Sequence, residues 1–452
     1  MLRKLPEEEL SVAGRIFSRR HVGQALFLDI WIGLDCSLQL YSKQSDFPNL
    51  FGNFLKACSR GDIIGAKGKL FVTKAGELTL RVRDLKVLAK SFSPWPDKYH
   101  GLIEVSQRYR KRFVDLQVNN ETGKIFIFRS KFISFLREFL SRHFFLEVET
   151  SYLENNPGGA SARPFVTQHH ALGKRLVLRI AQELSLKKLV IGGMNRIFEL
   201  GKVFRNEGLS SRHSPEFTML EAYAAYEDMW YFSSLLQELL IETVDRFSSF
   251  IDPRISGLIR SQWDIVKLTD LVERTFQMKL DKYQSWSLSD LKGEFTRKSG
   301  RTIPEYLTSN ADVLFWVFDR IVTRRIKVPT IVYGFPSKVS PLAKSDPRNS
   351  DLALRFEFYF EGVEVANCFT ELNDPFEQKR RFDQQLKARK HSSAEFEIEE
   401  TNQLNKEFVE ALFFGMPPTA GIGIGIDRLI MLLLGKKSIR EVILFPLLKD
   451  DE

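Results

Sequence analysis

Two stretches of alternating residues, separated by a polar loop, constrain the fold of this chain more than any other feature of its sequence. Residues 197–205 alternate between an apolar face and a face that carries Arg205, and residues 217–223 alternate again. A period of two is that of a β-strand, so we expect two antiparallel strands whose connecting loop begins with Phe204-Arg-Asn-Glu-Gly208 and contains His213. An arginine on a phosphate and an aromatic ring on a base are suited to bind a nucleotide. A surface hairpin with incidental charges is the alternative that this segment leaves open.

The composition excludes several classes of protein. A hydrophobic content of 43% with 27% charged residues is typical of a globular protein, and 452 residues allow two or three domains. Three cysteines, none in a CxxC pair, argue against a disulfide framework or a zinc site. The longest apolar run, 421–434, is interrupted by two charges and is too short for a bilayer, and residues 1–10 have no hydrophobic signal core. We therefore expect a cytoplasmic protein without a membrane partner, and its net charge of +9 favours a polyanionic partner.

The pattern of strands and helices predicts an α+β protein with a small barrel in front. Residues 1–93 contain five short strands with a helix around Lys56 after the third, which is typical of an OB-fold that binds oligonucleotides; a small barrel without a ligand is the less favoured alternative. Residues 94–112 begin with a proline-rich stretch and are expected to be a linker. Residues 113–452 read as hairpins flanked by helices, which favours an antiparallel sheet, with a helical insertion at about 250–325.

A second hairpin is predicted to carry a pair of carboxylates. Residues 354–364 are expected to turn at Glu361-Gly362, which pairs Tyr359 with Glu364 and places Glu357 on the same face. Two carboxylates this close repel unless a cation lies between them, and oxygen ligands beside a nucleotide favour Mg²⁺. Two solvated strand charges are the alternative.

The parity of this strand makes a further structural prediction. Asn367, Phe369 and Glu371 would lie on the opposite face from Glu364 if the strand were regular. If all four face one pocket, a β-bulge must fall between Val365 and Asn367.

A glycine-rich strand precedes the last predicted helix. Gly421, Gly423 and Gly425 leave one face without side chains, so a flat ring can lie on the backbone there. Arg428 then opens a helix, whose N-terminus and charge can meet a phosphate. A P-loop is excluded because no GxxxxGK[ST] follows. Tight packing of the strand against a helix is the alternative.

In this order the motifs resemble motifs 2 and 3 of class II aminoacyl-tRNA synthetases, with the barrel of the aspartate, asparagine and lysine subgroup in front. Within the subgroup the chain is similar to the bacterial-type lysyl-tRNA synthetases over about residues 10–450, without a counterpart of the helical extension that usually precedes the barrel. The segments that carry the resemblance are Phe145-Leu-Glu-Val-Glu-Thr150, Gly158-Gly-Ala-Ser-Ala-Arg-Pro-Phe165, Phe204-Arg-Asn-Glu-Gly208, Pro215-Glu-Phe-Thr-Met219, Ser340-Pro-Leu-Ala343, Glu371-Leu-Asn-Asp374, Pro417-Pro-Thr-Ala-Gly421, Gly425-Ile-Asp-Arg428 and Val442-Ile-Leu-Phe-Pro446.

The resemblance implies a lysine–tRNA ligase that forms lysyl-adenylate and pyrophosphate from lysine and ATP with Mg²⁺. The lysyl group would then pass to the terminal adenosine of tRNA-Lys. A homodimer with no DNA partner is implied as well. The residues that the resemblance assigns are Arg205 and Arg428 for catalysis; Arg205, Glu207, His213, Phe217, Glu357, Gly425 and Arg428 for ATP; Gly159, Glu183, Arg205, Glu221, Tyr223, Asn367, Phe369 and Glu371 for lysine; Glu357 and Glu364 for the metal; and Arg20, Phe27 and Gln39 for the anticodon.

The chemistry of the implied pocket favours lysine independently. Two acidic residues and a tyrosine hydroxyl suit an ammonium group, whereas an aspartyl- or asparaginyl-tRNA synthetase, the first alternative, should place cationic groups there. A second alternative is a divergent paralogue with a regulatory or protein-lysylation role, which should have lost the barrel or the catalytic charges. Departures from the family pattern bear on the dimer interface and on lysine affinity; they are Phe144, Ser151, Ser185, Ala366 and Cys368.

Overall fold

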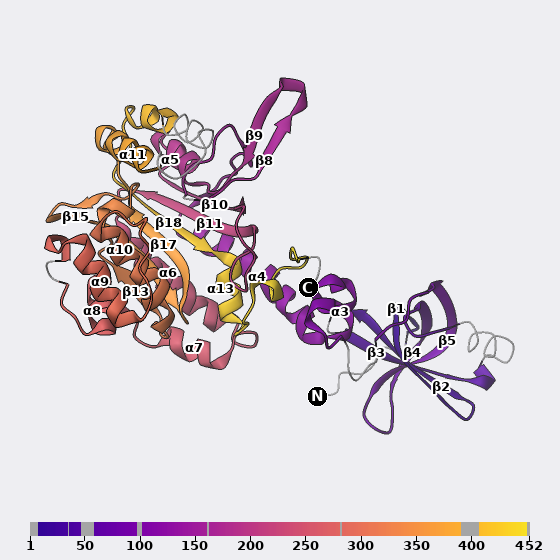
Figure 1. Cartoon of the computed structure of the whole chain (residues 1–452). Helices are drawn as coiled ribbons and strands as arrows, with labels where there is room; N and C mark the ends of the chain where they lie inside the picture. The colour runs from indigo at the N-terminus through magenta and orange to yellow at the C-terminus, as the bar shows by residue number, and fades with distance from the viewer. Residues whose placement is uncertain are drawn as a thin grey trace. The chain divides into compact units, whose positions relative to one another are not determined.

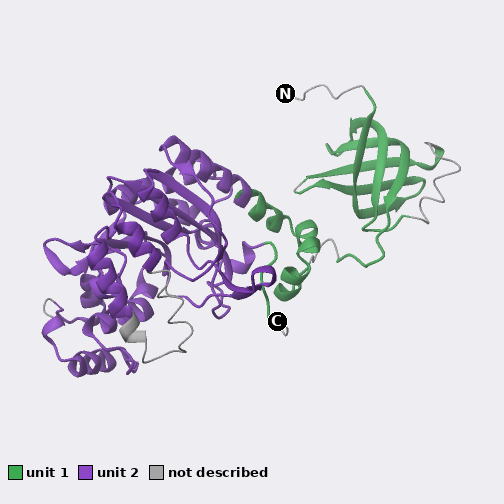
Figure 2. Cartoon of the chain, turned by 90° about the horizontal axis from the view of Figure 1, so that it is seen from above, with its two compact units in different colours: residues 1–128, 444–452 green, residues 129–443 purple. Residues whose placement is uncertain are grey.

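The computed structural model describes residues 8–34, 36–46, 58–96, 102–160, 162–280, 283–389 and 406–449. The chain forms two compact units, shown in Figure 2: residues 1–128 together with 444–452, and residues 129–443. Each unit has its own architecture and is considered separately. None of the described helices combines the length and the apolar character needed to cross a membrane.

The first unit contains a closed five-stranded barrel with the order β1-β2-β3-β5-β4. Its strands are β1 (Leu10–Val22), β2 (Ala25–Gly33), β3 (Cys36–Lys43), β4 (Ile63–Val72) and β5 (Leu78–Ala89). Along β2 the side chains of Leu26, Leu28 and Ile30 point into the barrel core, because alternate residues of a strand face opposite sides. The predicted OB-type barrel of five strands is confirmed. The helix expected around Lys56 lies outside the described residues.

The second unit is built on an eight-stranded sheet with the order β12-β13-β16-β17-β18-β11-β10-β6. The strands are β6 (Leu146–Glu147), β10 (Arg196–Phe204), β11 (Glu216–Ala225), β12 (Asp264–Lys267), β13 (Thr330–Tyr333), β16 (Arg355–Phe360), β17 (Val363–Thr370) and β18 (Thr419–Gly425). All neighbouring pairs are antiparallel except β10 with β6 and β12 with β13. The prediction of an α+β fold on an antiparallel sheet is therefore confirmed.

Helices cover the sheet of the second unit and connect its strands (Figure 1). They are the C-terminal part of α4 (Asn120–Arg142), α5 (Glu183–Ile191), α6 (Met229–Arg246), α7 (Pro253–Arg260), α8 (Leu268–Phe276), α9 (Leu288–Ser299), α10 (Asn310–Val317), α11 (Pro375–Arg389) and α13 (Ile426–Leu433); α2 (Val105–Arg110) and α3 (Arg112–Val118) belong to the first unit. On one face of the sheet, Leu220 and Ile424 from the central strands lie with Phe139 of α4 and Leu236 of α6. The two helices therefore bury the apolar face of the central strands, and the opposite face remains for other groups.

The expected helical insertion at about 250–325 contributes one strand to the sheet. Most of this region is helical and forms its own apolar cluster, which includes Val272, Phe295 and Phe318. Strand β12, however, pairs in parallel with β13 at the edge of the main sheet. Its four residues are too few for a periodic signal to separate them from the helices around them.

Two small sheets and several single turns complete the unit. The small sheets consist of β7 (Leu153–Glu154), β8 (Val166–His169) and β9 (Lys174–Leu178), and of β14 (Ser345–Asp346) and β15 (Asn349–Ala353). The short helical turns among its described residues are η2 (His170–Leu172), η3 (Tyr283–Ser285), η4 (Phe318–Val322), η5 (Thr323–Arg325), η6 (Ser337–Val339) and η7 (Ile439–Glu441), and η1 (Gln44–Asp46) lies in the first unit.

Candidate active site

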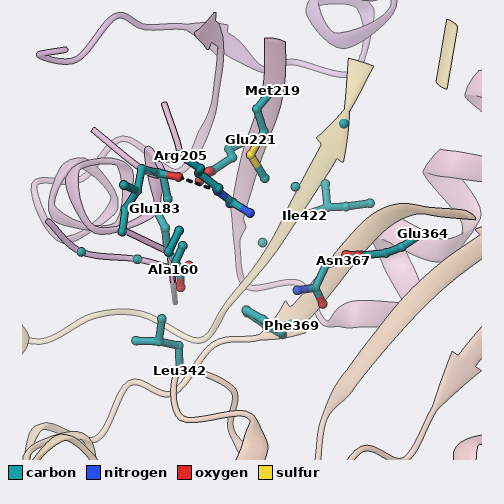
Figure 3. A pocket seen from close by; sticks show the side chains of 18 of the residues that line it. Ala160, Glu183, Arg205, Met219, Glu221, Leu342, Glu364, Asn367, Phe369 and Ile422 are labelled. Atoms are coloured by element: carbon teal, nitrogen blue, oxygen red, sulfur yellow. Dashed lines mark hydrogen bonds between the residues drawn. The ribbon is translucent and has the colours of Figure 1, made fainter. Parts of the chain in front are cut away.

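A cavity of about 590 Å³ lies on the face of the sheet opposite α4 and α6. Strands β11, β17 and β18 form much of its wall, and Figure 3 shows Glu183, Glu221 and Arg205 across the cavity from Glu364, Asn367 and Phe369. Most of the residues predicted for ATP, lysine or the metal line it. They are Gly159, Glu183, Arg205, Glu207, His213, Phe217, Glu221, Tyr223, Glu364, Asn367, Phe369, Glu371, Gly425 and Arg428.

The hairpin predicted to carry the carboxylates has the expected turn. Glu361 and Gly362 have positive φ angles of 52° and 71°, and Tyr359 pairs with Glu364. Positive φ at both central residues is the signature of a two-residue type I′ turn.

The predicted break in strand parity is also present. Phe358 pairs with Ala366 and Tyr359 with Glu364, so Val365 is the extra residue of a β-bulge. The bulge starts one residue earlier than the expected range, between Val365 and Asn367. It brings Glu364 to the same cavity as the side chains of β17 that follow.

Strand β18 makes room for side chains of the neighbouring strands. Gly421 is the register partner of Tyr223 and Gly423 that of Glu221. A Cβ atom on Gly421 would lie 2.3 Å from Cε1 of Tyr223 and 2.4 Å from Oε1 of Glu371. The surface expected to be bare for a flat ring is therefore occupied at this position. At Gly425 the nearest atom to an added Cβ is Cδ of Arg428 at 3.7 Å, so space for a ring remains there.

Three carboxylates form an acidic end of the cavity: Glu183, Glu221 and Glu371. Glu221 accepts a hydrogen bond of 3.1 Å from the backbone N–H of Gln182 and one of 3.3 Å from the Tyr223 hydroxyl. Burial, followed by the charge of Glu183, raises the pKa of Glu221 to about 7. Burial also raises the pKa of Glu371 to about 8, although the ammonium of Lys187 acts against it. Carboxylates buried this deeply are stabilised when a cation binds between them.

Gly159 shapes the wall beside Glu183. Its φ of 77° is a conformation that glycine adopts without cost, and a Cβ there would lie 3.0 Å from Cβ of Glu183 and 3.1 Å from that of Ala181. A side chain at this position would therefore push Glu183 and its helix away from the cavity.

The other end of the cavity carries the groups predicted for ATP. The guanidinium of Arg205 lies 5.2 Å from the ring centroid of Phe217, and its Nε donates to the carbonyl oxygen of Ile180 at 3.3 Å. Arg428 donates to the carbonyl oxygen of Glu364 at 3.2 Å and lies 3.5 Å from its carboxylate. Burial and the charge of Arg428 lower the pKa of His213, which favours a neutral imidazole. Cationic and aromatic groups thus face one region, as a nucleotide requires.

Glu357 does not line the cavity. It is buried, and its two oxygens accept hydrogen bonds from Arg355 and from the Tyr359 hydroxyl. Burial raises its pKa to about 7, and the nearby charge of Glu364 acts in the same direction. Among the described residues there is no group of three acidic, histidine or cysteine side chains that would hold a metal alone. The carboxylate of Glu364, which lines the cavity, fits a ligand of Mg²⁺. Glu357, which does not line it, would add only negative charge nearby.

Sequence reasoning missed Arg355 and Arg212, which also line the cavity. Arg355 is buried; its Nε donates to Oδ1 of Asn367 at 3.1 Å and its Nη1 to Oγ of Ser340 at 3.0 Å. It therefore orients a predicted lysine-pocket residue. The sequence could have indicated this residue, because Arg355 stands two positions before Glu357 and alternate residues of a strand share a face.

A buried ion pair corrects the description of strand β10. The face that carries Arg205 was expected to be the polar one, yet Glu199 on that face is buried. Its carboxylate lies 2.5 Å from the guanidinium of Arg179, which is buried as well. A glutamate in an alternating pattern is assigned to the polar face. Its burial becomes evident only when the partner that compensates its charge is found elsewhere in the chain.

The three residues predicted for the anticodon lie on one face of the barrel. Arg20 is the register partner of Phe27, and Gln39 that of Asp29, two residues further along β2. The Phe27 ring lies 5.1 Å from that of Tyr41. Gln39 is buried; its amide donates to Glu77 at 2.9 Å and accepts from Thr79 at 3.0 Å. Arg20 and Phe27 are thus the more accessible members of the set.

The departures from the family pattern differ in their structural consequences. Ala366 and Cys368 are buried and have no positive φ, so the bulge does not require the glycines that they replace. Phe144 has a φ of 65° and is 84% exposed, a strained conformation for a bulky residue. Ser151 is exposed and Ser185 half-buried.

The fold and the cavity define a class II aminoacyl-tRNA synthetase, and residues 104–449 match the tRNA synthetases of class II (D, K and N). The chain belongs to this family. It is 40% identical to the lysine–tRNA ligase of Listeria welshimeri serovar 6b over 98% of this chain and 87% of that protein. It is 40% identical to that of Bacillus subtilis strain 168 and 41% identical to that of Halalkalibacterium halodurans, again over at least 97% of this chain and 86% of those proteins. Within the class, the chain is a lysyl-tRNA synthetase of the bacterial type.

Proposed function

We propose that the cavity activates lysine with ATP and that the chain transfers the lysyl group to tRNA-Lys. The observation that carries this assignment is the cluster of Glu183, Glu221 and Glu371 at one end of the cavity, beside the hydroxyl of Tyr223. Lysine has two ammonium groups, and buried carboxylates without a bound cation are costly. A substrate with an acidic or amide side chain would leave these charges uncompensated, which argues against aspartate and asparagine.

In this proposal the ammonium groups of lysine orient its carboxylate toward Arg205. Glu183 and Gly159 take the α-ammonium, and Glu221, Tyr223 and Glu371 surround the ε-ammonium, with Asn367 and Phe369 along the side-chain stem. The 5.2 Å contact between Arg205 and the Phe217 ring supports a shared role, with adenine on the ring and the α-phosphate on the guanidinium. Glu207 and His213, in the loop between β10 and β11, would contact ATP, and so would Gly425 at the end of β18.

Activation then consists of an in-line displacement. The lysine carboxylate oxygen forms a bond to the α-phosphorus while the bond to the β-phosphate oxygen breaks and pyrophosphate leaves. No side chain is needed as a base, because the carboxylate is already ionised. Arg205 and Arg428, on opposite sides of the phosphates, stabilise the charge that develops. Orientation of the two substrates supplies much of the acceleration.

Mg²⁺ would bind beside Glu364, with Glu357 behind it, and would neutralise phosphate charge during the displacement. Because Arg355 and Tyr359 already engage Glu357, we propose that Glu364 supplies the direct ligand.

The remaining proposals concern the partners. Arg20, Phe27 and Gln39 would read the anticodon by stacking and hydrogen bonding. Exposed apolar side chains support a homodimer contact around β6 to β9; they are Phe144, Leu146, Leu153, Val166 and Leu172. The three cysteines are free, which fits the reducing cytoplasm as the place of action.

Aminoacylation of total tRNA with each of the twenty amino acids tests the proposed function. We expect charging with lysine alone, with ATP cleaved to AMP and pyrophosphate. Charging with aspartate or asparagine, or with no amino acid, would refute it. A Glu371→Gln variant serves as a control and should charge lysine poorly, since it loses a carboxylate from the acidic end.

A further inference from the structure

Lys187 is a buried lysine that does not belong to the cavity wall yet contacts two of its carboxylates. It lies on α5, is 1% exposed and is absent from the cavity lining. Its Nζ lies 2.5 Å from Oε1 of Glu183 and 2.5 Å from Oε2 of Glu371. The ring of Phe408 lies 5.8 Å from the same ammonium. The acidic end thus already contains one lysine ammonium, supplied by the protein itself.

The two oxygens of Glu371 face different groups. Oε2 faces Lys187, whereas Oε1 lies 2.4 Å from the position that a Cβ of Gly421 would occupy. Within the described residues neither oxygen has an aligned hydrogen-bond donor, so the contact with Lys187 is ionic and Oε1 is open to a second cation. The carboxylate of Glu371 can therefore contact the ammonium of Lys187 with one oxygen and an ammonium of the substrate with the other.

The charges around the acidic end balance only when Lys187 is counted. When all three are ionised, Glu183, Glu221 and Glu371 bring three negative charges, and Lys187 with Arg205 brings two positive ones. A lysine substrate adds one net positive charge, from two ammonium groups and one carboxylate. The end would then be neutral, which is what a desolvated site favours.

We propose that Lys187 is a positioning residue that orients Glu183 and Glu371 and favours the carboxylate form of Glu371, which binds the ε-ammonium of lysine. The inference rests on the proposed function, since it concerns how the same cavity selects its amino acid. Without the ammonium, the buried carboxylates repel each other and one of them takes up a proton instead of binding the substrate.

The groups around Glu371 determine its pKa, and with it the pH dependence of lysine binding. Glu371 faces Lys187 and Glu183 on α5 and Glu221 and Tyr223 on β11, with Cys368 on β17, the strand that ends just before Glu371. Burial raises the pKa of Glu371 to about 8 even with Lys187 present. Binding of lysine should therefore tighten as the pH rises through this value, while the ε-ammonium that Glu371 is proposed to bind stays largely protonated.

The test is the pH dependence of KM for lysine in ATP–pyrophosphate exchange, between pH 6.5 and 9, in the full-length protein. In Lys187→Met we expect the fall in KM to move upward by roughly 1 to 3 pH units, because an opposite charge at this distance shifts a carboxyl pKa by that much. The KM of this variant should therefore stay high at pH 9, where the KM of the wild type has already fallen. We expect kcat at saturating lysine to change less than KM, because Glu371 does not touch the reacting atoms.

Two further variants separate charge from packing. Lys187→Gln retains hydrogen-bond donors and is measured beside Lys187→Met, because loss of all contacts to two buried carboxylates threatens folding; we expect the same upward shift. Lys188→Gln is the matched control, since Lys188 is the neighbouring lysine, half-exposed and 3.6 Å from Glu407, and its profile should equal that of the wild type.

Each outcome is decisive. A KM in the Lys187 variants that is raised by one constant factor but still falls near pH 8, or a profile equal to that of Lys188→Gln, would overturn the assignment and leave Lys187 a structural residue. If the wild-type protein shows no exchange with lysine at any pH, the proposed function fails first, and the two failures are thereby distinguished.

Discussion

Substitution of the three glycines of β18 by alanine separates their roles, and the structure predicts a graded result. At Gly421 the new Cβ would lie 2.3 Å from the Tyr223 ring and 2.4 Å from the Glu371 carboxylate, and neither group has room to withdraw because both are buried. Overpacking of this kind costs about 1 to 3 kcal/mol of stability. Since the displaced groups are those proposed to surround the ε-ammonium, KM for lysine should rise at least about tenfold, equivalent to about 1.4 kcal/mol of binding.

The other two glycines should respond differently. At Gly423 the nearest atom is Cε of Met219 at 2.7 Å, the end of a flexible side chain, so Gly423→Ala should lose about 1 kcal/mol or less. At Gly425 nothing lies closer than 3.7 Å, and alanine should stabilise the free protein by about 0.5 kcal/mol, as it does elsewhere in strands. If adenine lies on this residue, Gly425→Ala should instead raise KM for ATP and leave that for lysine unchanged.

Urea denaturation and ATP–pyrophosphate exchange measure both effects. Gly293→Ala in α9 is the control, since no atom lies within 4 Å of the added Cβ; it should gain about 1 kcal/mol without a change in either KM. A Gly421→Ala protein with wild-type stability and wild-type KM for lysine would refute the reasoning. So would equal destabilisation at Gly421 and Gly425.

Two further substitutions probe strain and buried charge. Phe144→Gly should stabilise the chain by about 1 kcal/mol in urea denaturation, because the φ of 65° is strained for phenylalanine and free for glycine; a loss of stability would show that the exposed ring makes a contact that outweighs the strain. Glu221→Gln should be more stable than the wild type at pH 8 by roughly 2 to 4 kcal/mol but poor in lysine activation. The native pKa of Glu221, about 7, exceeds its ordinary value of 4.5, so its ionisation costs stability as the pH rises between these values. An advantage of Glu221→Gln that does not grow from pH 5.5 to pH 8 would contradict this.

Local backbone geometry explains why much of the site could be predicted from the sequence. The turn at Glu361-Gly362 requires positive φ at two successive residues, and an acidic residue followed by glycine between alternating apolar residues signals it. The bulge at Val365 followed from parity alone, because Glu364 and Asn367 can share a face only if one residue is extra. Alternation within β11 likewise placed Phe217 and Glu221 in one cavity.

The partners of buried charges could not be predicted in this way. Lys187 lies beside Glu371, and Arg179 neutralises Glu199. Both contacts join residues of different segments of the chain, so they depend on which segments pack together. Sequence periodicity reports which face a side chain occupies, but not which opposite charge faces it.

The sequence by itself therefore determined the class of fold, the strands that form the cavity and the face on which its side chains lie, because each follows from the backbone periods of strands and turns. Only the tertiary structure decided that Gly421 accommodates Tyr223 and Glu371, and that a lysine of the protein lies among the carboxylates proposed to bind a lysine substrate. The physical reason is that burial makes an unpaired charge costly, so packing selects its partner wherever that partner stands in the chain.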